Sequence, residues 1–177
     1  RWDCMHDLKR LRGATIGIIG LGRIGTAVAM RACSFGLTIC FYDPYLPIGI
    51  DKVFDYKRYD NLLEMINVCD FVSFHAPLTS ETEQMANDDF FSTIKRGSTI
   101  LNTARGKIIS LDSLYKAFRT NIVKAAGLDV LEYEKLSFES LFSSEMPSEL
   151  KKLLEFPNVL LTPHVAGWTV ESKRNLA

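Results

Sequence analysis

The chain has 177 residues, and 47% of them are hydrophobic, which is enough to bury the core of one domain of ordinary size. Its 21 Lys and Arg residues balance 21 Asp and Glu residues without a run of like charge, so we expect neither a nucleic acid nor an anionic membrane surface as a partner. The longest apolar runs span four residues, far short of the roughly 18 that cross a bilayer, which excludes a transmembrane helix.

Short apolar runs alternate with helical patterns from residue 15 onward. The runs are apolar almost throughout, which is typical of strands covered on both faces of a sheet. We expect strands at Thr15–Ile19, Thr38–Tyr42, Phe71–Phe74, Ser98–Leu101, Ala125–Leu128 and Val159–Leu161. Between them, apolar residues recur at helical spacing at Ile24–Phe35, Leu62–Ile66, Phe90–Ile94 and Leu111–Phe118. Strict alternation of strand and helix predicts an α/β domain with a doubly wound parallel sheet.

Two connections lie outside this alternation. Lys135 to Pro157 is long for a connection and mixes apolar with charged residues, so we expect it to lie over the surface as a solvated excursion. A short helix is expected within it, around Glu149–Leu154. Asp51 to Asp60 is rich in charges of both signs, and we expect it to be a surface connection.

A glycine motif, Gly20-Leu21-Gly22-Arg23-Ile24-Gly25, follows the first expected strand directly and opens the first helix. Its first glycine permits a tight turn, the second lets backbone N–H groups approach a pyrophosphate, and the third allows close helix–strand packing. The start of the helix then faces the phosphates with unpaired N–H groups and its positive dipole end. The motif predicts a Rossmann-type dinucleotide-binding domain. The alternative is a glycine turn that fits the pattern by chance.

Asp43 ends the second expected strand, eighteen residues after Gly25. A carboxylate at this position can accept hydrogen bonds from both hydroxyls of an adenosine ribose, and it would repel a 2′-phosphate. We therefore expect NAD rather than NADP as the cofactor. If the glycine turn were accidental, Asp43 would instead cap the loop before Pro44.

Polar groups also follow the later expected strands. They are His75-Ala76-Pro77-Leu78-Thr79, Asn102-Thr103-Ala104-Arg105-Gly106, the pair Asp129 and Glu134, and Pro163-His164. In an open parallel sheet, ligands bind at the edge where the carboxyl ends of the strands meet. We therefore expect these groups to lie beside the cofactor.

Six motifs in this order resemble the cofactor domain of the D-isomer-specific 2-hydroxyacid dehydrogenases, the family of the D-3-phosphoglycerate and D-lactate dehydrogenases. The motifs are GIIGLGRIG, FYDP, HAPLTSET, NTARG, GLDVLEYE and TPHVAGWT. The resemblance covers residues 10–175. It extends to the C-terminal-binding-protein corepressors, which are similar to this family and keep the domain.

The resemblance implies three catalytic residues. Arg105 would bind the carboxylate and carbonyl of the substrate, Glu134 would orient the catalytic histidine, and His164 would exchange the proton. The chemistry is consistent with these roles. Reduction of a 2-oxo acid delivers a hydride to C2 while the carbonyl oxygen gains a proton, which an imidazolium can donate near neutral pH. A neighbouring carboxylate favours the protonated imidazole, and a guanidinium offers paired donors to a carboxylate.

The glycine motif and the resemblance together assign eleven cofactor-binding residues: Gly20, Gly22, Arg23, Ile24, Gly25, Asp43, His75, Pro77, Thr82, Thr103 and Asp129. Arg23 and Ile24 would contact the pyrophosphate. Asp129 would hold the nicotinamide carboxamide, and Thr82 would lie near the nicotinamide half. His75 flanks the cofactor, either packed under the adenine side or in direct contact with it, and it has no expected role in proton transfer.

Members of this family carry a second domain, built from segments before and after the cofactor domain. We expect residues 1–177 to be the NAD-binding domain of a larger two-domain protein, with the substrate domain absent from this chain. The resemblance also implies a homodimer formed through the cofactor domain. The chain departs from the family where Lys135, instead of the usual proline, follows Glu134 and a long insertion begins.

The resemblance implies an oxidoreductase that transfers a hydride between NAD(H) and a small D-2-hydroxy acid or 2-oxo acid. The alternative is an NAD-sensing, corepressor-like interaction protein without metabolic turnover. The HAPLT motif is closer to the metabolic enzymes, whereas FYDPYL resembles the corepressors. A third possibility is a cofactor-binding remnant without activity.

The four cysteines show no C-x-x-C spacing, and three of them lie among apolar residues. This distribution favours reduced core thiols over a disulfide framework or a zinc site. We therefore expect no metal ligand and a cytoplasmic protein.

Overall fold

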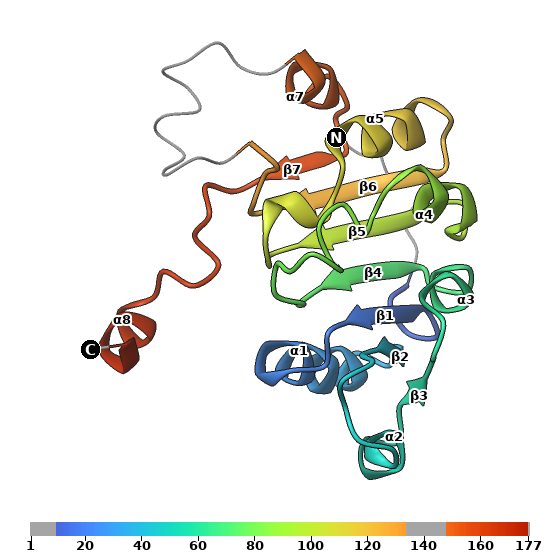
Figure 1. The fold of residues 1–177 in the computed structure, drawn as a ribbon, viewed down its shortest axis with the longest axis vertical. Helices are drawn as coiled ribbons and strands as arrows, with labels where there is room; N and C mark the ends of the chain where they lie inside the picture. Colours follow the sequence, from blue (N-terminus) through green and yellow to red (C-terminus); the bar gives the residue numbers. More distant parts are fainter. Residues whose placement is uncertain (1–9, 134–147, 177) are drawn as a thin grey trace.

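The computed structural model describes residues 10–133 and 148–176. Seven parallel strands form one sheet in the order β3-β2-β1-β4-β5-β6-β7 (Figure 1). The strands are β1 Thr15–Ile19, β2 Thr38–Tyr42, β3 Lys57–Arg58, β4 Phe71–Phe74, β5 Ser98–Asn102, β6 Val123–Leu128 and β7 Val159–Leu161. The strand order changes direction at β1, because β2 pairs with one side of β1 and β4 pairs with the other. The expected doubly wound sheet is confirmed.

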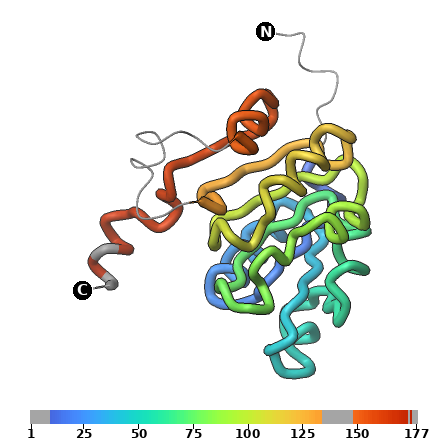
Figure 2. The backbone as a smooth tube through the Cα atoms, turned by 45° about the horizontal axis from the view of Figure 1, so that its top comes forward, coloured from blue at the N-terminus to red at the C-terminus, as the bar shows by residue number. Residues whose placement is uncertain are grey.

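Helices cover both faces of the sheet. They are α1 Arg23–Ser34, α2 Ile50–Phe54, α3 Leu62–Ile66, α4 Asp88–Thr93, α5 Leu111–Arg119, α7 Ser148–Leu153 and α8 Val170–Leu176, with a 3₁₀ turn at Gly106–Ile108. None of the helices in the described part of the chain is long and apolar enough to cross a membrane. After β7 the chain leads away from the sheet to α8 (Figure 2).

The near-continuous apolar strands are explained by the two cores that the sheet separates. Ile18 of β1 belongs to the core under α1 and α2, whereas its neighbour Ile19 belongs to the core under α3, α4, α5 and α7. Phe41 and Phe74, both fully buried, occupy the first and second core respectively. Because successive side chains point to opposite faces, a strand buried on both faces must be apolar at every position.

The residues of α1 that are fully buried against the sheet are small. Gly25 and Ala29 are buried, whereas Ile24 is 67% exposed. The helical spacing of apolar residues correctly indicates the helix, but not which residues it buries. The close approach of α1 to the sheet leaves no room for a side chain at Gly25, while Val28 and Ala32 pack against the core beside it.

Residues 51–60, expected to be a surface connection, instead contribute secondary structure at the edge of the sheet. Helix α2 and the two-residue strand β3 form here, and the rings of Phe54 and Tyr56 stack at 5.5 Å between centroids. Tyr56 is buried against the α1 side of the sheet. Ile50, Val53 and Phe54 recur at helical spacing in α2, but the mixed charges around them favour a connection, and the two residues of β3 carry no period.

Helix α7 corrects the expectation of a solvated excursion at residues 135–157. Residues 134–147 lie outside the described part of the chain, but α7 forms close to its expected place. Leu150 and Leu153, one helical turn apart, are buried in the core shared with α5. Phe156 then packs its ring against Phe118, with centroids 5.1 Å apart. The end of this segment is therefore part of the core.

The thiols also differ from expectation. Cys40 and Cys69 are buried and free, as expected of reduced core thiols, but Cys33 is exposed on α1. Cys4 lies outside the described residues.

The buried face of α7 gives a test with a matched control one residue away. Leu153 is fully buried, whereas Leu154 is 39% exposed. Leu153→Ala should lower the free energy of unfolding by about 2–4 kcal/mol, because it removes buried methyl groups and leaves a cavity. Leu154→Ala should cost less than about 1 kcal/mol. Urea unfolding of both variants measures the difference, and equal losses would show that α7 does not pack on α5.

Candidate active site

The glycine turn after β1 is shaped by two contacts that exclude side chains. Gly20 has a φ of +87°, and a Cβ there would lie 2.8 Å from the backbone nitrogen of Ala76. A Cβ at Gly25 would lie 2.1 Å from the carbonyl oxygen of Gly20. The turn therefore presses directly against α1 and against the end of β4. Glycine at these two positions is a requirement of the protein's own packing.

Gly22 is different, because a Cβ at this position would meet no atom within 4 Å. It is the N-cap of α1 and provides no side-chain hydrogen bond to the first turn. Arg23 and Ile24, which begin the helix, are exposed. The first-turn N–H groups thus remain available to an anion, beside open space that only a glycine leaves clear. This arrangement fits a pyrophosphate.

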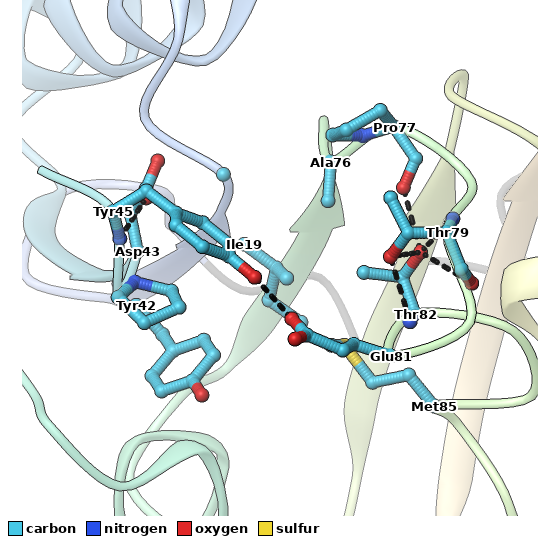
Figure 3. A pocket seen from close by; sticks show the side chains of 12 residues that line it. Ile19, Tyr42, Asp43, Tyr45, Ala76, Pro77, Thr79, Glu81, Thr82 and Met85 are labelled. Carbon is cyan, nitrogen blue, oxygen red and sulfur yellow. Dashed lines mark hydrogen bonds between the residues drawn. The ribbon is translucent and has the colours of Figure 1, made fainter.

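Asp43 joins the end of β2 to the glycine turn. One carboxylate oxygen accepts a hydrogen bond from the backbone N–H of Leu21, and the other accepts from that of Tyr45, both at 3.0 Å. The carboxylate is thereby fixed at the rim of a cavity of about 150 Å³ between the loops that follow β2 and β4 (Figure 3). A cavity of about this size can hold an aromatic ring such as benzene. An adenine beside a ribose therefore fits this position.

The loop after β4 forms the opposite wall of the cavity. The hydroxyl of Thr82 donates to the carbonyl of Pro77 at 2.6 Å and accepts from the N–H of Thr79 at 2.8 Å. Both Pro77 and Thr82 line the cavity that contains Asp43. The structure thus brings Thr82 to the Asp43 side of the site, and its expected place near the nicotinamide half stays a prediction.

His75 lies just before this loop and is half-buried. Its Nε2 is 2.9 Å from the hydroxyl of the buried Ser73. Burial lowers the pKa of His75, which favours the neutral imidazole near pH 7. A neutral, partly buried ring is consistent with packing beside the cofactor, and we assign it no proton transfer.

Arg105 stands on a turn that Asn102 holds in place. Asn102 is buried, and its side-chain amide donates to the carbonyl of Arg105 and accepts from the N–H of Ala104, both at 3.0 Å. The guanidinium of the exposed Arg105 donates to the carbonyl of Ala104 at 2.7 Å. Thr103, also exposed, lies in the same turn. Asn102 belongs to the polar group expected beside the cofactor, but here it fixes the turn, as an asparagine at a strand end often does by bonding nearby backbone groups.

Asp129 organises the chain around His164. Its buried carboxylate accepts hydrogen bonds from the Thr162 hydroxyl at 2.5 Å and from the N–H groups of Val165 and Ala166 at 2.9 Å. Its carbonyl accepts from the N–H of His164 at 2.9 Å. His164 adopts a φ of +52°, which is uncommon for a residue with a side chain. The carboxylate therefore holds the bend from which His164 extends.

The pKa of Asp129 reflects these contacts. Burial alone would raise the pKa of this carboxyl, but the hydrogen bonds from Thr162, Ala166 and Val165, together with the charge of His164, bring it below its ordinary value. Asp129 is therefore ionised at neutral pH. Its contact with a nicotinamide carboxamide stays a prediction.

Backbone hydrogen bonds link the carboxyl ends of three neighbouring strands. The N–H of Asp129, after β6, donates to the carbonyl of Asn102 at the end of β5 at 2.9 Å. The carbonyl of Asp129 in turn accepts from His164, after β7. The structure thus brings Arg105, Asp129 and His164 to one edge of the sheet.

Glu134 lies outside the described residues, but the segment before it is anchored twice. A Cβ at Gly106 would lie 1.9 Å from the carbonyl oxygen of Leu131, so this segment passes directly over the turn that carries Arg105. One carboxylate oxygen of Glu132 accepts from the N–H of Leu111 at 2.9 Å, and the other accepts from the side-chain amide of Gln84 at 3.2 Å. Nothing in the local sequence distinguishes this anchoring role of Glu132.

Known proteins were compared with the chain. A family model, D-isomer specific 2-hydroxyacid dehydrogenase, NAD binding domain, matches residues 1–166. D-3-phosphoglycerate dehydrogenase 1 of Saccharomyces cerevisiae is 34% identical over 167 residues, which make up 94% of this chain and 35% of that protein. Glyoxylate reductase of Thermofilum pendens is 35% identical over 94% of this chain and 46% of its own length. The chain thus spans less than half the length of these relatives.

Among solved structures, D-lactate dehydrogenase from Aquifex aeolicus, in complex with NAD and lactic acid, is similar with a TM-score of 0.83 and 33% identity. The match covers 95% of this chain and 51% of that one. D-2-hydroxyisocaproate dehydrogenase is similar with a TM-score of 0.85 and 27% identity, over 95% of this chain and 51% of its own.

The lowered pKa of Asp129 predicts a pH dependence of stability. A carboxyl whose pKa is lower in the folded than in the unfolded chain stabilises the fold above its unfolded pKa of about 3.9, and this stabilisation is lost as the pH falls through the native value. Asp129→Asn should therefore lower the free energy of unfolding at pH 7 by about 1–3 kcal/mol. On acidification, the free energy of unfolding of this variant should fall less than that of the wild type.

Urea unfolding at a series of pH values from neutral to acidic measures this dependence. Asp55→Asn, at an exposed position, is the control and should follow the wild-type curve. A parallel acid response of Asp129→Asn and the wild type would contradict the assignment.

Proposed function

Because the chain belongs to the D-isomer-specific 2-hydroxyacid dehydrogenases, as their NAD-binding domain, we propose that the whole protein transfers a hydride between NAD(H) and a small D-2-hydroxy acid or its 2-oxo acid. One observation carries the proposal. Arg105, Asp129 and His164 are tied to one sheet edge by the hydrogen bonds that link β5, β6 and β7. The glycine turn and Asp43 lie at the same edge of the sheet, at the ends of β1 and β2.

We propose that residues 1–177 form the cofactor half of a two-domain enzyme whose other half binds the substrate. The share of the relatives that the chain spans, 35% of the yeast and 46% of the archaeal enzyme, supports this division. Enclosure by a second domain would exclude water and position the substrate, which contributes strongly to catalysis.

Three parts of the chain would bind NAD. The first-turn N–H groups of α1, with Arg23 and Ile24, would hold the pyrophosphate next to Gly22. Asp43 would accept hydrogen bonds from the ribose hydroxyls, and the adenine would enter the cavity between the loops after β2 and β4. The bound cofactor supplies or receives the hydride.

The remaining chemistry falls to side chains of this chain. Arg105 would bind the substrate carboxylate through its paired N–H donors, which a lysine could not reproduce. His164 would donate a proton to the carbonyl oxygen during reduction and accept it during oxidation. Glu134 would orient the imidazole and favour its protonated form. Asp129 supports this chemistry by fixing the backbone of residues 162–166.

The corepressor-like alternative would bind NAD(H) without turnover. The relatives named above are reductases and dehydrogenases of metabolism, which favours the enzyme. Full-length protein that binds NADH tightly and reduces none of a panel of 2-oxo acids would instead support the sensing function.

We also propose that the protein forms a homodimer through this domain and resides in the cytoplasm. Exposed apolar side chains support the dimer, since Met30 of α1 and Phe35 at its C-cap are 56% and 65% exposed and a partner would cover such residues. The buried, free thiols of Cys40 and Cys69 support a reducing compartment.

The full-length protein tests the proposed reaction through His164. His164→Ala should lower kcat by about 10²–10⁴-fold while the Kd of NADH changes little, because the substitution removes the proton donor and leaves the phosphate site. The oxidation of NADH is followed by absorbance with pyruvate, hydroxypyruvate, glyoxylate and phosphohydroxypyruvate. Arg105→Lys should raise KM as well as slow the reaction.

Arg96→Lys is the matched control for Arg105→Lys. Arg96 lies at the opposite edge of the sheet, where it donates to the carbonyls of Thr120 and Asn121 at 3.0 Å, so its replacement should leave kcat and KM unchanged. A wild-type kcat in His164→Ala would rule out the proposed proton transfer.

A further inference from the structure

A hydrogen bond between Tyr45 and Glu81 spans the cavity beside Asp43. The Tyr45 hydroxyl, on the loop after β2, donates to the carboxylate of Glu81, on the loop after β4 (Figure 3). The backbone N–H of the same Tyr45 donates to Asp43 at 3.0 Å. One residue thus connects two carboxylates that belong to opposite walls of the cavity, and all three residues line it.

The backbone that carries Glu81 is fixed independently of this bond. The N–H groups of Thr82 and Glu83 donate to the carbonyl of Thr79 at 3.2 and 2.9 Å, and the N–H of Thr79 donates to the Thr82 hydroxyl at 2.8 Å. The side chain of Glu81, in contrast, is exposed to solvent. Its carboxylate is held at the cavity by the phenol of Tyr45.

Two carboxylates and no cationic side chain stand among the described residues that line the cavity. The carboxylates are those of Asp43 and Glu81. The hydrogen bond to Glu81 raises the pKa of Tyr45, with further contributions from burial and from the charges of Glu81, Tyr42 and Asp43. The phenol therefore stays protonated and donates its hydrogen bond to Glu81. Because a phenol is neutral, it does not offset the negative charge of either carboxylate. A phosphate group on a nearby ribose would face two negative charges.

We propose that Glu81, held across the cavity by Tyr45, is a second determinant of the preference for NAD over NADP, in addition to Asp43. This inference rests on the proposed function, because it assumes that the adenosine half of the cofactor occupies the cavity. Asp43 acts at the ribose itself, whereas Glu81 acts at a distance through its charge. Tyr45 acts through Glu81 and is a positioning residue.

The test is the ratio of Kd for NADPH to Kd for NADH, measured by calorimetric titration of the full-length protein. Glu81→Gln should lower this ratio about three- to tenfold, as expected for removal of one charge from a largely solvated site that receives a phosphate. Tyr45→Phe should lower it in the same direction, because the freed carboxylate moves into solvent. The double variant should show no more than the effect of Glu81→Gln.

Glu83→Gln is the matched control. Glu83 lies two residues further along the same loop and pairs with Lys107 at 3.4 Å, but it does not line the cavity. Its replacement should leave the ratio within about twofold of the wild type, since exposed charges at greater distance are screened.

The outcomes separate this inference from the proposed function. A ratio unchanged by Glu81→Gln, in a protein that binds NADH, would overturn the role of Glu81 and leave the proposed function intact. Additive effects of the two substitutions would show that Tyr45 does not act through Glu81. A wild-type protein that fails to bind NADH would overturn the proposed function and this inference together.

Discussion

The geometry of the site depends on a contact between two stretches of backbone that leaves no room for a side chain. A Cβ at position 25 would lie 2.1 Å from the carbonyl oxygen of Gly20, so α1 can begin where it does only if residue 25 is glycine. This contact places the N-terminus of α1 at the edge of the sheet where the strands have their carboxyl ends. It also brings the glycine turn within reach of Asp43, whose carboxylate accepts from Leu21. The cavity lined by Gly20 and Asp43 follows from that arrangement.

The same edge is continued by hydrogen bonds from strand to strand. Asn102 secures the turn of Arg105, its carbonyl accepts from Asp129, and Asp129 holds the bend at His164. Each of these groups satisfies a backbone donor or acceptor at the end of a strand, where the sheet no longer provides one. The residues that complete the strand ends thus also place the side chains proposed for catalysis.

Much of this arrangement could be predicted from the sequence, because strands buried on both faces and the glycine motif are local patterns. The paired strands and the place of Asp43 follow from them. Helix α2 and strand β3 are not expected from the sequence, because the mixed charges of residues 51–60 favour a surface connection and the two residues of β3 carry no period. The burial of α7 and the bond from Tyr45 to Glu81 are contacts between segments distant in sequence, which only the folded chain reveals.

Gly22 offers the most direct test that the glycine turn binds a dinucleotide, because the protein's own packing does not require glycine there. Gly22→Ala should cost less than about 1 kcal/mol of stability, since the new Cβ meets no atom within 4 Å and only a helix cap is weakened. Calorimetric titration should show that the variant binds NADH at least about tenfold more weakly, because the new methyl group narrows the approach of the pyrophosphate to the N–H groups. Unchanged NADH affinity in the folded variant would contradict the proposed site.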